Sequence, residues 1–308
     1  MDLIFLGTGA GVSSKKRNVS SVALSLVQEI NSVWLFDCGE ATQHQIMRTA
    51  IRPRKIDKIF ITHMHGDHIY GLPGLLGSRS FQSGEGLLTV YGPAGIEEFL
   101  TVTLRTSGTH LKYPLKIVEI EEGKLFEEDG FSVYAKKLDH GIPCYGYRIE
   151  EKDKPGELLV ENLRQAGISP GPIYREIKEN EFVVTENGST LWRKDFIGPD
   201  KKGRTVSILG DTRYSDTHVS FVEGSDLLVH EATFKHDMDR QASDYFHSTS
   251  AQAATLAASA SVNKLVLTHI SSRYKEEDEP LILAEAKEIF PTTVLAHDFF
   301  QVSIDDLK

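Results

Sequence analysis

The stretch that decides the fold is His63-Met64-His65-Gly66-Asp67-His68, which directly follows an apolar run. Residues two apart in an extended strand point to the same side, so His63 and His65 share one direction. Gly66 permits a sharp turn, and Asp67 and His68 then stand where a helix begins. Imidazole and carboxylate groups are suitable zinc ligands, and four of them so close together can serve two ions. A solvated polar turn is the weaker alternative, because three histidines crowd this short stretch.

Further ligands must come from distant parts of the chain. Three candidates each follow an apolar run, namely His140, Asp211 and His269. The stretch 59–63 resembles 265–269, since each is an apolar segment that ends in Thr-His. Taken singly, each of these residues is more often a packed or surface residue, but together they complete a two-metal site.

The alternation of short apolar runs with helical patterns predicts a layered α/β sandwich, because two blocks of strands each carry helices. The predicted strands are 3–6, 22–27, 33–36, 58–61, 88–91, 115–120, 131–135, 145–149, 206–209, 227–230, 264–267 and 293–296. The predicted helices are 67–77, 96–106, 248–260 and 281–289, with Ser248 as an N-cap.

Residues 151–203 differ from the rest of the chain. They contain Pro155-Gly156 and Pro170-Gly171-Pro172, mix acidic with basic residues and show weak apolar periodicity. A structureless loop of this length is uncommon in a compact domain, although a long surface loop is the alternative. We therefore predict a single domain over 1–308 with an inserted protruding arm, a helix and a hairpin, at about 151–203.

Charge and cysteine content exclude several classes of protein. The 308 residues include 34 Lys plus Arg against 44 Asp plus Glu, a net charge of −10, whereas a nucleic-acid coat protein is normally basic. Any phosphate ligand must therefore meet local basic clusters or metal ions. Cys38 and Cys144 form no disulfide framework, which fits a reduced intracellular setting. With no basic leader and no membrane-length apolar stretch, we expect a soluble cytoplasmic protein with no membrane partner.

The pattern His-x-His-x-Asp-His with distant His, Asp and His resembles that of the metallo-β-lactamase superfamily. The resemblance implies an αββα sandwich with two zinc ions per subunit at the sheet edges. It implies His63, His65 and His140 on one zinc, Asp67, His68 and His269 on the other, and Asp211 as a bridge between them.

Finer motifs resemble the ribonuclease Z family over nearly the whole chain. They are Phe-Leu-Gly-Thr-Gly-Ala-Gly at 5–11, Phe-Asp-Cys-Gly-Glu-Ala-Thr-Gln at 36–43, His-Glu-Ala-Thr at 230–233, His-Ser-Thr at 247–249 and His-Ile-Ser-Ser-Arg-Tyr at 269–274. The chain departs from the family at 13–18, which lacks a frequent proline, so the treatment of a CCA end stays open. The 7–11 loop lacks a P-loop lysine and a full dinucleotide fingerprint, so no nucleotide cofactor is expected.

The resemblance implies a zinc-dependent endoribonuclease that removes the 3′ trailer from precursor tRNA, leaving a tRNA 3′-hydroxyl and a trailer 5′-phosphate. Asp67 would orient or deprotonate the attacking water, and His247, held by Glu231, would be the general acid. It further implies a homodimer and RNA-binding positions at Lys15, Arg17, Asn18, Pro170, Gly171, Pro172 and Arg273.

Each of these roles has a purely structural alternative, and the function has alternatives as well. The basic run 15–17 could be a solvated face, and Glu231 and His247 could be structural. The alternative function is a small-substrate metallo-hydrolase on the same fold, such as a phosphodiesterase, thioesterase or lactonase. A non-catalytic RNA-binding module is the second alternative, although such proteins typically lose ligands and all seven positions here are filled by ligating types.

Overall fold

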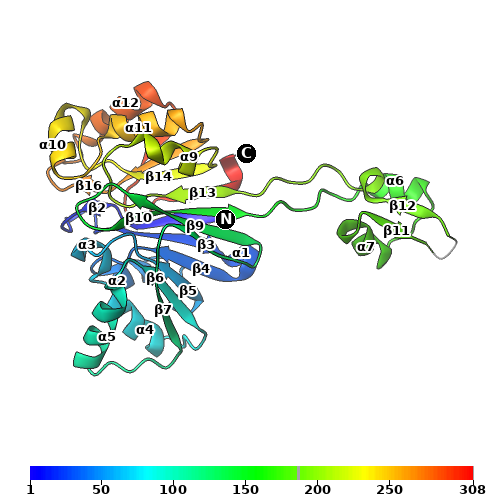
Figure 1. Ribbon diagram of the computed structural model, residues 1–308, viewed down its shortest axis with the longest axis horizontal. Helices are drawn as coiled ribbons and strands as arrows, with labels where there is room; N and C mark the ends of the chain where they lie inside the picture. Colours follow the sequence, from blue (N-terminus) through cyan, green and yellow to red (C-terminus); the bar gives the residue numbers. More distant parts are fainter. Residues whose placement is uncertain (186–187, 308) are drawn as a thin grey trace. The chain divides into compact units, whose positions relative to one another are not determined.

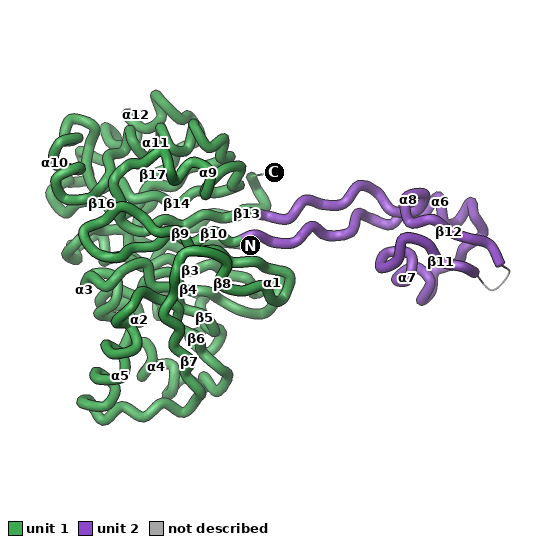
Figure 2. The backbone as a smooth tube through the Cα atoms, viewed as in Figure 1, with its two compact units in different colours: residues 1–149, 205–308 green, residues 150–204 purple. Residues whose placement is uncertain are grey.

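The computed structural model describes residues 1–185 and 188–307, which form two compact units (Figure 2). The first unit comprises Met1–Ile149 and Thr205–Lys308, and the second is Glu150–Arg204. Residues 186–187, which fall within the predicted arm, lie outside the described residues.

The first unit contains two seven-stranded sheets. In order across the first sheet, the strands are β18 (Gln301–Ser303), β1 (Asp2–Gly7), β3 (Ser21–Leu26), β4 (Ser32–Phe36), β5 (Ile56–Phe60), β6 (Leu88–Gly92) and β7 (Leu115–Glu119). Across the second they are β17 (Thr293–Leu295), β15 (Lys264–Thr268), β14 (Leu227–Glu231), β13 (Thr205–Ile208), β10 (Cys144–Glu151), β9 (Phe131–Leu138) and β8 (Gly123–Glu128).

Parallel pairing explains why several central strands are buried along their whole length. Strands β4 to β7 pair in parallel, as do β13, β14, β15 and β17. Strands of such sheets are covered on both faces, and every residue of β4, β6 and β14 is buried. Alternate side chains of β4 serve different layers, since Trp34 packs between the sheets and Leu35 packs beneath the helices.

Three hydrophobic clusters define four layers (Figure 1). One cluster joins the outer face of the first sheet to α4 (Leu72–Phe81) and α5 (Ile96–Thr106). A second fills the space between the sheets, and a third joins the second sheet to α11 (Ser250–Ser259) and α12 (Glu279–Ile289). The predicted αββα sandwich is thus confirmed.

Two helix predictions were wrong in detail. The single helix predicted at 67–77 is two helices, α3 (Gly66–Ile69) and α4, and Pro73 stands in the first turn of α4. A Cβ at Gly71, between them, would lie 1.9 Å from the carbonyl oxygen of Gly39, so a glycine is needed there. Ser248 is not the N-cap of α11, because Thr249 accepts a hydrogen bond from Gln252 in a capping box.

The predicted strands and remaining helices are present, with ends that shift by a few residues. Elements that the pattern missed are short or exposed, and β8 buries none of its residues fully. In the first unit these are β8, β18, β2 (Gly9–Ala10), β16 (Ile270–Ser271), α1 (Val27–Ile30), α2 (Thr42–Ile46), α9 (Val219–Val222), α10 (Asp239–Asp244) and the 3₁₀ turns Pro53–Lys55, Asp216–His218, His236–Met238 and Asp305–Leu307.

The second unit has its own small core. It contains α6 (Val160–Gln165), α7 (Ile173–Glu179), a hairpin of β11 (Phe182–Val184) and β12 (Thr190–Trp192), and α8 (Arg193–Phe196). One cluster of buried apolar side chains joins these elements, namely Leu163, Ile177, Val183, Leu191, Phe196 and Ile197.

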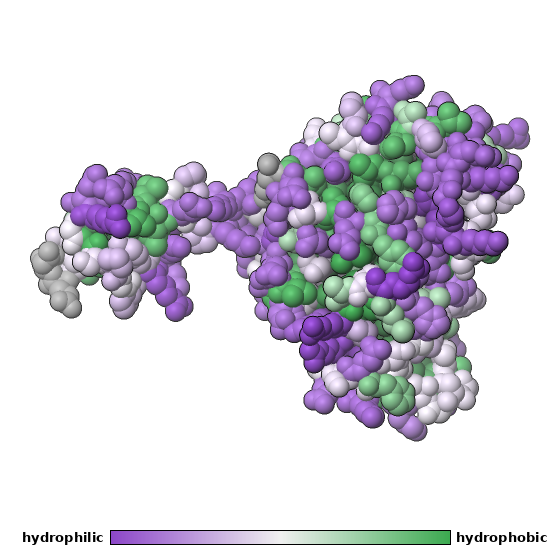
Figure 3. All heavy atoms as spheres, turned by 180° about the vertical axis from the view of Figure 1, so that it is seen from behind, coloured by the Kyte–Doolittle hydropathy of each residue, from purple (hydrophilic) through white to green (hydrophobic). Residues whose placement is uncertain are grey.

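The surface carries mixed polarity. On the face drawn in Figure 3, hydrophilic and hydrophobic residues are interspersed. Within residues 1–185 and 188–307, no helix has both the length and the apolar character that crossing a membrane requires.

Candidate metal centre

The structure brings all seven predicted ligand side chains together. His63, His65, Asp67 and His68 follow β5, and the other three follow strands of the second sheet: His140 after β9, Asp211 after β13 and His269 after β15. Candidate ligand atoms lie within 4.8 Å of one another in His63–His65–His140 and in Asp67–His68–His269. The ligand atoms of Asp211, His63 and His68 also lie within 4.8 Å of one another.

Asp211 occupies the centre of this constellation. Its Oδ2 atom lies 3.6 Å from Nε2 of His63, 3.6 Å from Nε2 of His68 and 3.4 Å from Nε2 of His269. Oδ2 of Asp67 lies 3.5 Å from Nε2 of both His68 and His269, and it accepts a 2.8 Å hydrogen bond from the backbone N–H of Gly11. The Gly7–Gly11 loop therefore helps to position a candidate ligand.

Asp37 and Thr62 fix the rings of His63 and His68. The Thr62 hydroxyl donates to Oδ2 of Asp37 at 2.9 Å, so it accepts from Nδ1–H of His63 at 3.0 Å. Nδ1–H of His68 donates to the same carboxylate at 2.8 Å. Both rings thereby turn Nε2 toward the centre, the atom that can bind a metal ion there.

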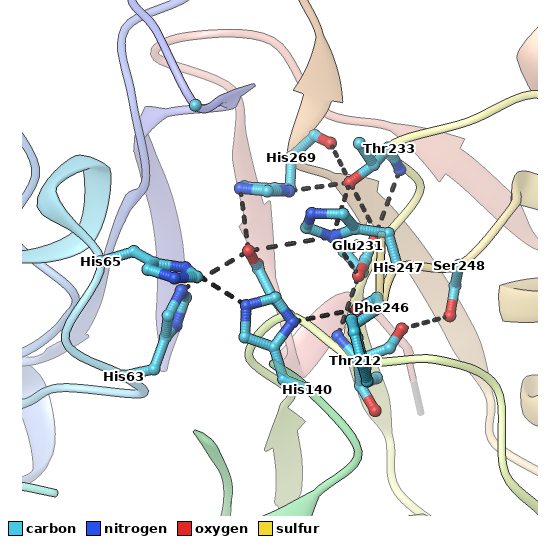
Figure 4. Close-up of polar contacts among 12 residues, drawn as sticks. His63, His65, His140, Thr212, Glu231, Thr233, Phe246, His247, Ser248 and His269 are labelled. Atoms are coloured by element: carbon cyan, nitrogen blue, oxygen red, sulfur yellow. Dashed lines mark hydrogen bonds and ion pairs between the residues drawn. The ribbon is translucent and has the colours of Figure 1, made fainter. Parts of the chain in front are cut away.

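Two other histidines are held in the same way (Figure 4). The Thr233 hydroxyl donates to Oε2 of Glu231 at 2.6 Å and accepts from Nδ1–H of His269 at 2.9 Å. Nδ1–H of His140 donates to the backbone carbonyl of Phe246 at 2.9 Å. Nε2 of each ring is thereby left as a lone pair.

The chemistry of this donor set fits a divalent cation. Nε2 of His63 is buried and has no hydrogen-bond partner among the described residues, an arrangement that costs about 1–3 kcal/mol if left uncompensated. With its Nδ1 protonated, His63 presents a lone pair toward the oxygen of Asp211, and two acceptors facing each other require a positive charge between them. The residues therefore fit a metal ion.

The pKa shifts agree with this view. Burial alone raises the pKa of both Asp67 and Asp211, but the neighbouring imidazoles outweigh it and hold both pKa values below the usual range. Burial, followed by the charge of His68, lowers the pKa of His63. Burial also lowers the pKa of His68, but Asp211 and Asp37 outweigh it and raise that pKa, so the carboxylates favour a cation at this ring.

A second constellation adjoins the first. Nδ1 of His247 lies 2.9 Å from Oε1 of Glu231, and that oxygen also accepts from the backbone N–H of Thr212 at 2.9 Å. Burial alone lowers the pKa of His247, but the Glu231 carboxylate outweighs it and raises the pKa to about 9. The Glu231 carboxylate therefore favours the protonated form of this imidazole. Figure 4 shows Ser248 beside this pair, donating to the Thr212 carbonyl at 2.6 Å.

Members of both constellations line one open pocket of about 320 Å³. Its walls include Asp67, His140 and His247, together with Phe234, Tyr245 and Arg273. The lining combines acidic and imidazole side chains with aromatic and basic ones, so the pocket can accept an anionic group that carries a flat ring.

The predicted RNA-binding residues lie in different settings. Lys15 and Arg273 are exposed, and Pro170, Gly171 and Pro172 are exposed in the second unit. Arg17 is buried: its guanidinium donates to Thr8 and to the Ala296 carbonyl and pairs with Glu279 at 2.7 Å. Asn18 donates from its side chain to the Glu40 carbonyl at 2.7 Å. These two side chains hold their loop in place and do not face solvent freely.

Sequence patterns missed several residues that hold the site. Asp37 directly follows an apolar strand, and that position could have marked it as a polar group at the sheet edge. Thr233 lies within a quoted motif but carried no assigned role. The Phe246 carbonyl is a backbone group, so no residue type signals it.

Known proteins resemble this chain at full length. A ribonuclease Z from Oceanobacillus iheyensis is 63% identical over 301 residues, covering 97% of this chain and 98% of that protein. One from Geobacillus kaustophilus is 58% identical and covers 99% of each. Human tRNase Z, short form, superposes with a TM-score of 0.70 at 31% identity over 99% of each chain. The metallo-β-lactamase fold protein YhfI from Bacillus subtilis has a TM-score of 0.68 at 23% identity, covering 98% of each chain. A family model described as anti-Pycsar protein Apyc1 matches residues 1–153.

Proposed function

Because this chain belongs to the ribonuclease Z family, endoribonucleases of the metallo-β-lactamase fold, we propose that it removes the 3′ trailer from precursor tRNA by zinc-dependent hydrolysis of one phosphodiester bond. The products are then a tRNA 3′-hydroxyl and a trailer 5′-phosphate. The observation that carries this proposal is the convergence of seven His and Asp side chains beside the Glu231–His247 pair, with five of the seven and His247 lining one open pocket.

Two zinc ions per subunit fit the donor set. His63, His65 and His140 would hold one ion, Asp67, His68 and His269 the other, and Asp211 both. When bound, such a metal pair supplies a water nucleophile of lowered pKa and positive charge for the phosphate oxygens. The Asp67 carboxylate, which accepts from the Gly11 N–H, would orient the attacking water or accept its proton.

His247 would supply the proton for the leaving group. Its Nδ1 faces Glu231, so Nε2 is the atom left to donate to the 3′ oxygen as the P–O bond breaks. Glu231 is a positioning residue: buried and itself held by Thr212 and Thr233, it keeps the imidazole protonated and oriented.

Recognition of the RNA would fall to several parts of the chain. Exposed Lys15 and Arg273 are suited to contact phosphates, whereas Arg17 and Asn18 would act by holding their loop. The second unit, with Pro170, Gly171 and Pro172 at its surface, would grip the tRNA body by shape. We propose a homodimer acting in the cytoplasm, where Cys38 and Cys144, both free, would stay reduced.

The decisive experiment incubates zinc-loaded protein with a 3′-extended precursor tRNA, with and without a chelator, and maps the cut. Chelator-sensitive cleavage just after the discriminator base, leaving a 3′-hydroxyl, is expected. A protein that binds zinc and turns over only a small phosphodiester or thioester would instead be a small-substrate hydrolase.

Deletion of residues 151–203 separates these functions further. Strands β10 and β13 are neighbours, so a short turn can rejoin them. Precursor cleavage should fall sharply while hydrolysis of a small phosphodiester survives. Unchanged precursor cleavage would contradict the role of the second unit.

A further inference from the structure

One wall of the pocket beside the metal centre is aromatic. Phe234 and Tyr245 line the same cavity as Asp67 and His247. The planes of the two rings are inclined by only 20°, with centroids 6.4 Å apart. The roles proposed above for the metal ligands and His247 leave both rings unused.

Phe234 forms the buried part of this wall. It is only 3% exposed, and the Arg273 guanidinium lies 4.8 Å from its ring centroid. Arg273 is itself held by Ser271 and Gln241, each at 3.2 Å. The ring and the cation over it are therefore fixed in place before any ligand arrives.

Tyr245 presents its ring to solvent. It is 62% exposed, although it follows directly on α10 and its backbone N–H donates to the Gln241 carbonyl at 3.0 Å. The next residue, Phe246, has a left-handed backbone with φ of 61°, which turns the chain sharply between Tyr245 and His247. An exposed ring on a fixed backbone at the mouth of a phosphodiester site is suited to stack on a nucleobase.

We propose that Tyr245, supported by Phe234, stacks on the base of the nucleotide whose 3′ oxygen leaves, which is the last nucleotide of the tRNA body. This assignment rests on the proposed function. The His247 ring lies 6.2 Å from the Phe234 ring, so an oxygen that takes its proton from His247 places the attached sugar beside this wall. The trailer lies on the other side of the phosphate.

The test measures kcat/KM of wild type, Tyr245→Ala and Tyr245→Phe on three precursor tRNAs. One is intact, one is abasic at the last tRNA nucleotide, and one is abasic at the first trailer nucleotide. Tyr245→Ala should lower kcat/KM on the intact precursor by about 5- to 150-fold, and Tyr245→Phe should stay near wild type. Phe81→Ala, at another exposed ring, is the matched control and should change nothing.

The abasic substrates locate the stacked base. The loss of kcat/KM in Tyr245→Ala should vanish on the precursor that is abasic at the last tRNA nucleotide. It should persist on the precursor that is abasic at the first trailer nucleotide. An equal loss on all three substrates would overturn stacking and leave a structural role, and loss of the effect only with the abasic trailer would overturn the assigned side. Wild type that fails to cut the precursor overturns the proposed function as well, whereas normal cleavage by Tyr245→Ala overturns the stacking site alone.

Discussion

Nδ1 of His247 lies 2.9 Å from a carboxylate oxygen of Glu231, and Glu231 is only 1% exposed. A buried carboxylate needs compensation, and here it comes from the imidazole together with Thr212 and Thr233. The same contacts leave Nε2 of His247 available to the pocket. A structural ion pair would not need to open onto the metal centre, so the arrangement favours a role for His247 in proton transfer.

Replacing His247 with alanine should therefore slow cleavage of precursor tRNA by about 10²–10⁴-fold, because the leaving oxygen loses its acid. A substrate with a better leaving group, such as a nitrophenyl phosphodiester, should suffer less. Single-turnover rates on both substrates measure this. His44→Ala, at an exposed histidine of α2, is the control. An equal loss on both substrates would argue against general-acid catalysis.

Asp67→Ala should abolish cleavage while leaving tRNA affinity largely intact. The carboxylate lies among candidate metal ligands, whereas the tRNA body is proposed to bind the second unit. Cleavage assays and binding titrations with an uncleavable precursor would measure the two properties separately. An equal loss of tRNA binding and cleavage would contradict the assignment of cleavage to the metal centre and of binding to the second unit.

Asp37→Asn should weaken zinc binding by about 10- to 100-fold, the usual cost of losing a partner that orients a ligand. One oxygen of Asp37 accepts from the Thr62 hydroxyl and from His68, and the other accepts from the Thr62 backbone N–H, whereas an amide cannot accept on both of its atoms. Asparagine tolerates the left-handed backbone that Asp37 adopts, with φ of 56°, so the fold should survive.

Competition with a chromogenic chelator would measure the zinc affinity of this variant. Asp57→Asn, at a carboxylate that accepts from Ser32 away from the metal centre, is the matched control. Unchanged affinity in Asp37→Asn would show that His63 and His68 keep their orientation without that carboxylate.

The sequence predicted what depends on local pattern. His63 and His269 could be recognised from the sequence, because each closely follows an apolar strand, β5 and β15 respectively. The contacts that orient these ligands could not be recognised from the sequence, because they join distant segments. The His140 ring donates to the Phe246 carbonyl, 106 residues away in the sequence, and the Thr233 hydroxyl accepts from His269, 36 residues away. Only the tertiary fold brings such groups together: Thr233 and His269, for example, follow β14 and β15, which are paired neighbours in the second sheet. The break before α4 was missed for the same reason, because Gly71 must clear the Gly39 carbonyl.

His218 should make stability fall in mild acid. It is only 2% exposed, and burial, then the charges of His230 and Lys136, lower its pKa to about 4 from an ordinary 6.5, against a smaller opposing effect of Asp139. The unfolded chain therefore takes up the proton first. The stabilisation due to neutral His218 is complete above pH 6.5 and is lost progressively as the pH falls toward 4.

Urea unfolding at constant zinc loading, measured at several pH values, would test this through the difference between wild type and His218→Gln. The variant lacks the titrating imidazole, so its free energy of unfolding should fall less steeply than that of wild type between pH 6.5 and 4. Taking the difference removes the contributions of other buried histidines, such as His230. His44→Gln, at an exposed position, should run parallel to wild type. Parallel curves for His218→Gln and wild type through this interval would mean that His218 takes up its proton as readily in the folded protein as in the unfolded chain.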